Sequence, residues 1–282
     1  MSNEKEPWEI PAWHSIRRES VLVRHLIGSG ATALGRANYA DQTGEYYTAF
    51  FGLSIGLERL AKLTLVADHA ISNAGAMPAE KLIRNYGHKL IDLLDAADEV
   101  GAKHSLTLRY SRPTSAVSKK IIDCLDAFAD AARGRYANFA ALGDPNLTQA
   151  EPIRKWWGDV AELILKEHNY GRSVQKRVES RAHVVDALMS PISLVHYFNE
   201  SGDAMQEVLT ASIRTGQTEQ VQKYGRYYAL TIVRWLAELF SKAARSASDT
   251  HRVHAFHGAW EHFQTYTLGD DFLKSRKNWP LN

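Results

Sequence analysis

Arg84 and His88 lie four residues apart and could together act on a phosphate group. An arginine guanidinium is a planar fork that pairs with phosphate oxygens. A histidine titrates near neutral pH and can accept or release a proton during a reaction. Gly87 favours a helix end between the two, with His88 at the start of the next helix, where a phosphate can also bind. The alternative is structural: Arg84 is solvated and His88 packs against that helix start or caps it.

Three residues near the end of another expected helix could bind a nucleic acid. Arg133, Arg135 and Tyr136 follow an apolar segment that begins at about Ala116. Arginines beside an aromatic ring can hold phosphates and stack on RNA bases. The same arginines suit the negative end of a helix dipole, with Tyr136 in the core. Both interpretations stay open.

A longer basic stretch runs from Lys166 to Arg181 and is interrupted by Glu167 and Glu179. It is either a stripe that contacts nucleic acid or the solvated face of a helix. The mixed signs of charge favour the solvated face.

The densest group of histidines lies between His251 and His262. On a continuous helix of ~3.6 residues per turn, His254, His257 and Glu261 would project within about 60° of one another, a possible three-ligand metal face. Gly258 disfavours a continuous helix there. Surface or interface histidines are therefore preferred, and we predict no metal site and no cofactor.

Helical periodicity dominates the chain, and no convincing strand pattern occurs. The clearest helix runs from about Glu45 to Ser72. Its Gly52 and Gly56 would each cost ~1 kcal/mol relative to alanine in an exposed helix. They therefore predict that another helix approaches closely. The single cysteine, Cys124, lies in an apolar helix and is expected to be buried.

Further helices are expected over 16–40, 79–86, 89–100, 116–133, 151–188, 205–213 and 219–247. The segment 151–188 is either one helix or two, broken near 169–171. The run 141–148, with Gly143 and Pro145, is the best boundary. We predict an all-α protein of about nine helices, with an N-terminal helical bundle over 1–143 and a C-terminal helical region over 149–282. Trp156 and Trp157 are expected to anchor the second region against the first.

The composition excludes several classes of protein. A chain of 282 residues can bury a large core without disulfides or metals. Its 34 Lys+Arg and 32 Asp+Glu give a net charge of +2, which excludes a wholly basic surface but permits a local basic groove. One cysteine excludes a disulfide framework and fits a reducing compartment. Because neither a signal core nor a long apolar run occurs, we expect a cytoplasmic protein with no membrane partner.

Three segments, in order, resemble the HEPN family of helical-bundle domains. The segment 46–63 is similar to the long family helix, with paired aromatics, small residues, then Glu58 and Lys62 four apart. The segment 87–94 resembles the family's His-x-Leu…Leu-Leu helix opening, and 132–139 resembles its Arg-Tyr segment. The resemblance covers about residues 45–139, and the C-terminal half matches no family pattern.

The resemblance implies a metal-independent endoribonuclease of a prokaryotic toxin–antitoxin or antiviral defence system, commonly a dimer, that leaves a 2′,3′-cyclic phosphate. Family active sites carry an arginine and then a histidine with four to six residues between. Arg84 and His88 have three between, and no histidine follows Arg135 until His168. A histidine distant in sequence would complete a site at Arg135.

We therefore predict Arg84 and His88 as catalytic residues, Arg133, Arg135 and Tyr136 as nucleic-acid-binding residues, and RNA as a partner. The alternative is a catalytically inert helical adaptor that forms a homodimer and binds a partner protein.

Overall fold

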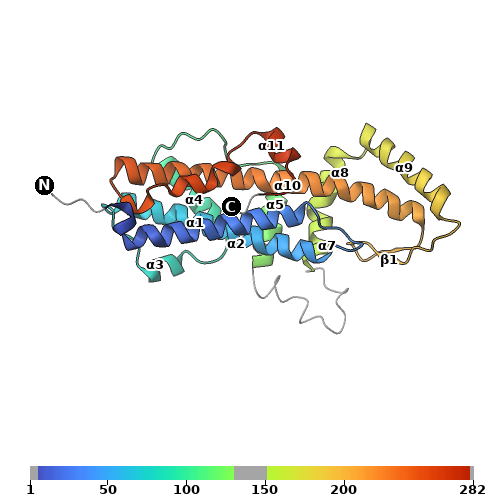
Figure 1. Ribbon diagram of the computed structural model, residues 1–282, viewed down its shortest axis with the longest axis horizontal. Helices are drawn as coiled ribbons and strands as arrows, with labels where there is room; N and C mark the ends of the chain where they lie inside the picture. Colours follow the sequence, from blue (N-terminus) through green and yellow to red (C-terminus); the bar gives the residue numbers. More distant parts are fainter. Residues whose placement is uncertain (1–5, 130–150, 280–282) are drawn as a thin grey trace.

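Three long helices run side by side along the longest axis of the molecule (Figure 1). They are α1 (Pro11–Leu34), α2 (Gly44–Ser72) and α10 (Val208–Arg245). The computed structural model describes residues 6–129 and 151–279. Within these residues it contains ten α-helices and one short β-hairpin. The predicted all-α fold of about nine helices is confirmed.

Helices α1 and α2 approach each other so closely that their backbones touch. A Cβ atom placed on Gly52 would lie 2.6 Å from the carbonyl oxygen of Leu26 and 2.9 Å from the Cα of Gly30. A Cβ on Gly56 would lie 2.6 Å from Cγ1 of Ile27. The close approach predicted from these two glycines is confirmed, and the neighbouring helix is α1.

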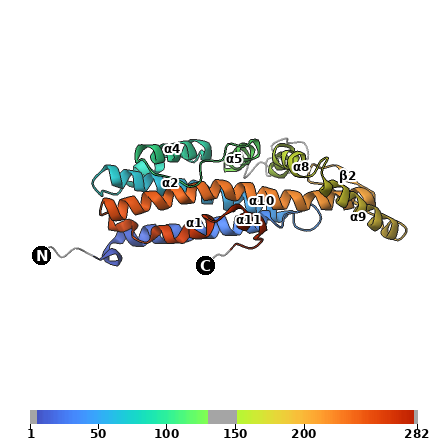
Figure 2. The same ribbon diagram turned by 90° about the horizontal axis from the view of Figure 1, so that it is seen from above.

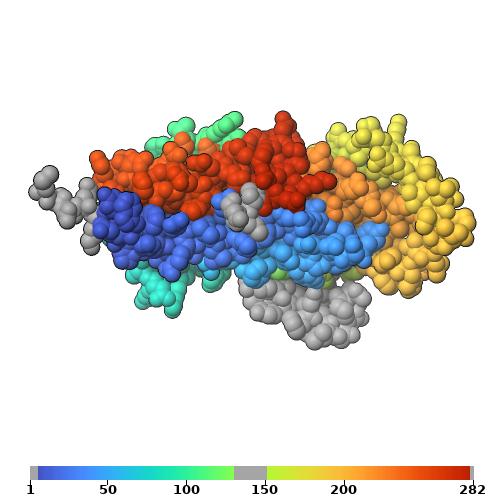
Figure 3. Space-filling model, in the orientation of Figure 1, coloured from blue at the N-terminus to red at the C-terminus, as the bar shows by residue number. Residues whose placement is uncertain are grey.

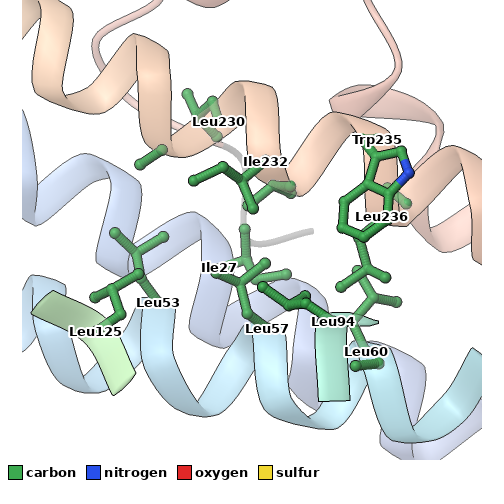
Figure 4. Packing of buried hydrophobic residues seen from close by; sticks show 14 of the residues in the cluster. Ile27, Leu53, Leu57, Leu60, Leu94, Leu125, Leu230, Ile232, Trp235 and Leu236 are labelled. Atoms are coloured by element: carbon green, nitrogen blue, oxygen red, sulfur yellow. The ribbon is translucent and has the colours of Figure 1, made fainter. Parts of the chain in front are cut away.

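A row of shorter helices covers one face of α2 and α10 (Figure 2). The row consists of α4 (Leu90–Lys103), α5 (Ala116–Ala129) and α8 (Glu162–His168). Between the layers lies a continuous hydrophobic core, in which Ile232 and Trp235 of α10 pack near Leu57 of α2 and Leu94 of α4 (Figure 4). Cys124 is buried at the edge of this core, as predicted, and burial raises the pKa of its thiol to about 12.

Two tryptophans join the C-terminal part of the chain to the N-terminal part. Helix α7 (Pro152–Trp156) continues through a π-helical turn, η3 (Trp157–Ala161), into α8. The ring of Trp156 packs 5.5 Å from that of Phe50, and Nε1 of Trp157 donates to the hydroxyl of Tyr46 at 2.9 Å. The predicted anchoring role is confirmed. The core contains residues from both predicted regions, while the boundary run 141–148 lies outside the described residues.

The helical segment 151–188 is broken where the sequence permitted a break. Helix α8 ends at His168, Gly171 adopts a left-handed φ of 70°, and α9 (Ser173–Met189) begins two residues later.

The prediction of two helices over 205–247 is wrong, because α10 runs unbroken from Val208 to Arg245. Gly216 lies inside α10, where a Cβ would meet Cγ1 of Val178 at 2.5 Å, so this glycine makes room for α9.

A two-stranded antiparallel hairpin, β1 (Tyr197–Phe198) and β2 (Ala204–Met205), was not predicted. Its strands are too short to show alternation. The turn depends on Asn199, whose side-chain oxygen accepts from the backbone N–H groups of Ser201 and Asp203 at 2.9 Å. Gly202 supplies a φ of 86°.

Short helical segments complete the body. They are η1 (Pro7–Glu9), α3 (Glu80–Asn85), η4 (Ser246–Thr250), η5 (His254–Phe256), η6 (Ala259–Tyr266) and α11 (Asp270–Ser275). One of them, α11, packs against the middle of α10. The molecule is an elongated body (Figure 3). Helix α9 and the hairpin form its far end, opposite the end at which α1 begins. Within the described ranges, no helix combines the length and apolar character needed to cross a membrane.

Candidate functional site

A cavity of about 540 Å³ lies between α1, α2 and the segment that carries α3. Its apolar lining consists of Ala12, Ile16, Leu63, Val66, Met77, Pro78 and Ile83. Its polar lining consists of Ser15, Glu19, Glu58, Arg59, Lys62 and His88. The volume is within the range of about 300–1,000 Å³ that is usual for small-molecule sites. Of the two predicted catalytic residues, the cavity contains His88.

Glu58 organises the polar side of the cavity. Its Oε1 accepts hydrogen bonds from Nζ of Lys62 and from Nδ1 of His88, each at 2.9 Å. The carboxylate and the ammonium are largely buried, with side chains 13% and 15% exposed, whereas the His88 side chain is 81% exposed. Because an ionised carboxylate only accepts, Nδ1 of His88 must carry the hydrogen. The other ring nitrogen, Nε2, is then free to exchange a proton with a ligand.

The backbone around His88 explains why this imidazole reaches Glu58. Helix α3 ends at Asn85, and Gly87 turns the chain with a φ of 74° before α4 begins at Leu90. The predicted helix end before His88 is therefore confirmed. The start of α4 is not free for a phosphate, because Asp126 of α5 accepts from the backbone N–H groups of Leu90 and Ile91 at 2.6 and 3.3 Å.

Arg84 does not line the cavity. Its guanidinium is 76% exposed and pairs with Glu80 one turn earlier in α3, at 2.5 Å. The cations that do line the cavity are Lys62 and Arg59, and Arg59 is held by Glu19 of α1 at 2.5 Å. In the sequence, Glu58 and Lys62 stood out only by their spacing of four residues. Between Phe50 and Ala67 the charged residues of this helix are Glu58, Arg59 and Lys62, and this was the signal that could have identified the pair.

The predicted nucleic-acid-binding residues Arg133, Arg135 and Tyr136 lie outside the described residues, which stop at 129 and resume at 151. In the basic stretch, Lys166 pairs with Glu162 on α8 at 3.6 Å. On α9, Arg177 and Arg181 are exposed to solvent. This arrangement fits the preferred interpretation of a solvated helix face.

The histidines between 251 and 262 do not share one helix. His254 begins η5 and Glu261 belongs to η6, and Gly258 between them has a left-handed φ of 74°. The three-ligand face, which required a continuous helix, is therefore not formed. Among the described residues, no group of three or more histidine, cysteine, aspartate or glutamate side chains is arranged to hold a metal ion.

A second histidine with acid–base partners joins α8 to α10. The ring of His168 stacks on that of Tyr224, with centroids 3.6 Å apart and planes 2° apart. Its Nε2 lies 3.0 Å from the hydroxyl of Tyr228, which donates to Glu167 at 2.9 Å. Burial lowers the pKa of His168 below the usual value for histidine. Because Tyr224 covers one face of the ring, we interpret this group as a structural connection between the two helices.

The fold and the cavity thus define an all-α protein with a histidine that is held by a buried carboxylate at the edge of an apolar pocket. Comparisons of the chain with protein-family models, curated proteins and solved structures gave no match. The HEPN resemblance over 45–139 therefore stays a prediction from the sequence.

Proposed function

We propose that the protein is a HEPN-like endoribonuclease of a prokaryotic toxin–antitoxin or antiviral defence system, and that it cleaves RNA without a metal ion. One observation of the structure supports this proposal most strongly. The exposed imidazole of His88 is oriented by the buried carboxylate of Glu58 at the edge of a cavity large enough for a nucleotide. A carboxylate that holds one ring nitrogen of a histidine fixes its tautomer and leaves the other nitrogen for proton transfer.

In the proposed reaction, Nε2 of His88 takes the proton of a ribose 2′-hydroxyl as the 2′-oxygen attacks the adjacent phosphorus. The bond from phosphorus to the 5′-oxygen breaks, and this oxygen leaves with a proton from water. The products are a 2′,3′-cyclic phosphate and a 5′-hydroxyl. Lys62 and Arg59 face the cavity and would stabilise the charge that develops on the phosphate, a role that the sequence analysis gave to Arg84.

We expect His88→Ala to lower the rate of RNA cleavage by about 100-fold or more, the usual minimum for removing a general acid or base. The substrate is a fluorescently labelled pool of random single-stranded RNA, incubated with EDTA. The products are separated on a gel and tested for a cyclic phosphate. Because the His88 side chain is 81% exposed and Glu58 keeps its bond to Lys62, the melting temperature of the variant should stay close to that of the wild type.

Arg84→Gln is the matched control, because Arg84 is charged and exposed but lies outside the cavity lining. It should change the rate less than about threefold, since a solvent-exposed ion pair contributes little. A wild-type protein that cleaves no RNA would contradict the proposal, as would equal rates for His88→Ala and the wild type.

A second candidate function, a dimeric adaptor, is supported by an apolar patch at the far end of the molecule. Its eight large side chains are each 41–89% exposed: Val184, Val185, Leu188, Met189, Ile192, Leu194, Tyr197 and Phe198. They belong to α9, β1 and the connection between them, which lie at one end of the elongated body (Figure 1).

We assign the apolar patch to contact with a second copy of this chain. Apolar patches on a monomer rarely exceed roughly 300–600 Å², whereas a stable dimer buries about 800 Å² on each partner. Eight side chains at these exposures supply an area of the order that a dimer requires. Hydrophobic burial of this surface is the driving force for association.

We expect the wild type to be a dimer in light scattering after gel filtration, and the variant Leu188→Glu/Ile192→Glu/Leu194→Glu to be a monomer. The control is Val21→Glu/Leu22→Glu, which changes exposed apolar residues of α1 outside the patch. This control should stay dimeric. A monomeric wild type at 100 μM, or a triple variant that still dimerises, would rule out this interface.

A further inference from the structure

A second cavity, of about 350 Å³, lies between the C-terminal end of α10, the segment after α4 and the helical turn η6. Its lining residues are Arg109, Tyr110, Glu238, Ser241, Lys242, Arg245, Trp260, Gln264 and Thr267. None of these residues lines the His88 cavity. It is therefore a separate site with its own chemistry.

The charge of this cavity is positive. Three cations, Arg109, Lys242 and Arg245, face one carboxylate, that of Glu238. Each oxygen of Glu238 accepts from one backbone N–H group, that of Arg109 at 2.8 Å and that of Tyr110 at 2.9 Å. None of the three cations forms an ion pair within residues 6–129 and 151–279. Such a cluster on an otherwise near-neutral chain favours an anionic ligand.

Planar groups lie beside these cations. The guanidinium carbon of Arg245 is 5.0 Å from the centre of the Trp260 ring. Two guanidinium groups lie over the ring of Tyr110, that of Arg109 at 5.1 Å and that of Arg234 at 3.9 Å from its centre. The Tyr110 hydroxyl is buried and has no hydrogen-bond partner within the described ranges. Aromatic rings and guanidinium planes are the surfaces on which nucleic-acid bases stack.

We propose that this cavity binds a nucleotide unit, with its phosphate on Arg109, Lys242 and Arg245 and its base stacked on Trp260. The unit is either a free nucleotide or one residue of an RNA strand. The cations supply affinity for the phosphate, and the planar groups distinguish a nucleotide from inorganic phosphate. The proposal does not rest on catalysis by His88.

The test measures binding to protein that carries His88→Ala, so that RNA is not consumed. Three probes are titrated by calorimetry: AMP, pyrophosphate and a ten-residue single-stranded RNA. The charge variant is Arg109→Gln/Lys242→Gln/Arg245→Gln, and its matched control on α9 is Lys176→Gln/Arg177→Gln/Arg181→Gln. All six side chains belong to exposed residues, so both variants should keep the melting temperature of the parent.

We expect the charge variant to weaken binding of AMP or RNA by at least tenfold and the α9 control to leave it within twofold. Trp260→Leu should weaken the binding of AMP by about threefold or more and leave the binding of pyrophosphate unchanged. For RNA, each lost phosphate contact should reduce the slope of log K against log salt by about 0.7, and therefore by about 2 for the charge variant.

The two sources of ligand are separated by the probes. Binding of AMP that depends on the three cations indicates a free-nucleotide site, and binding of the RNA alone indicates a strand-binding site. An equal loss of binding affinity in both triple variants would overturn the proposal, because it would show that the probes bind through non-specific attraction to positive charge. Pyrophosphate binding as tight as AMP, or no binding of any probe, would also overturn it. Because both triple variants carry His88→Ala and an otherwise unchanged His88 cavity, a difference between them reports on this second cavity and not on RNA cleavage by His88.

Discussion

Gly52→Ala is expected to lower the free energy of unfolding by about 3 kcal/mol, in the upper part of the range for overpacked cores. The added methyl would lie 2.6 Å from the carbonyl oxygen of Leu26 and 2.9 Å from the Cα of Gly30. Both contacts are with backbone, so no side chain can rotate away, and α1 and α2 must separate. Separation opens gaps along the whole interface, which loses close contacts on both helices.

The matched control is Gly44→Ala at the beginning of the same helix, where a Cβ meets no atom within 4 Å. This change should alter the free energy of unfolding by less than about 0.5 kcal/mol, as for ordinary surface substitutions. Urea unfolding, monitored by circular dichroism, measures the free energy of unfolding of both variants. If Gly52→Ala unfolds at the same urea concentration as the wild type, the backbone contact between α1 and α2 is not as tight as described.

Glu200→Gln is expected to lower the free energy of unfolding by about 3–5 kcal/mol, the cost of breaking a buried ion pair from one side. The Glu200 side chain is fully buried and accepts from Nε of Arg214 at 2.9 Å and from the hydroxyl of Tyr46 at 3.1 Å. Burial and the nearby Glu200 charge raise the pKa of Tyr46 well above its usual value, so this hydroxyl stays protonated and keeps donating. The guanidinium of Arg214 also stacks on Trp157, 3.6 Å from the ring centre.

Without the carboxylate, a mostly buried guanidinium loses its counter-charge. Arg84→Gln is the comparison, because Arg84 and Glu80 form an ion pair in which both side chains are more than three-quarters exposed. That change should cost less than about 0.5 kcal/mol, since exposed pairs contribute little. Thermal and urea unfolding of both variants give the two values. A loss below 1 kcal/mol for Glu200→Gln would mean that the Glu200–Arg214 pair does not hold the hairpin to the helical body.

The sequence predicted features that depend on neighbours along the chain. The limits of α2, the break near Gly171 and the close approach at Gly52 all follow from local spacing, and the structure confirms them. The helix partner of Gly52 could not be predicted, because a glycine indicates close packing without indicating the neighbour. The continuity of α10 was missed, because two separate helices were expected over 205–213 and 219–247, whereas Gly216 lies inside α10 and makes room for Val178 of α9.

The candidate site was less predictable because its contacts join distant parts of the chain. His88 was selected for its chemistry, and its partner Glu58 lies 30 residues earlier. Arg84 was selected because it is close in sequence, but α3 directs it to Glu80 rather than to the cavity. Asp126, which accepts from the backbone at the start of α4, lies 36 residues after Leu90 in the sequence. Periodicity carries no information on such pairs.

The late position of α10 in the chain has a consequence for biosynthesis. This helix supplies Ile232, Trp235 and Leu236 to the middle of the core, yet it ends at residue 245. On the ribosome, at about 5–20 residues per second, the partner surfaces of α2 and α4 emerge many seconds before α10 can cover them. During this interval Leu57 and Leu94 face solvent or a chaperone. A chain that terminates before residue 208 would keep this apolar surface uncovered and would be a substrate for aggregation and proteolysis.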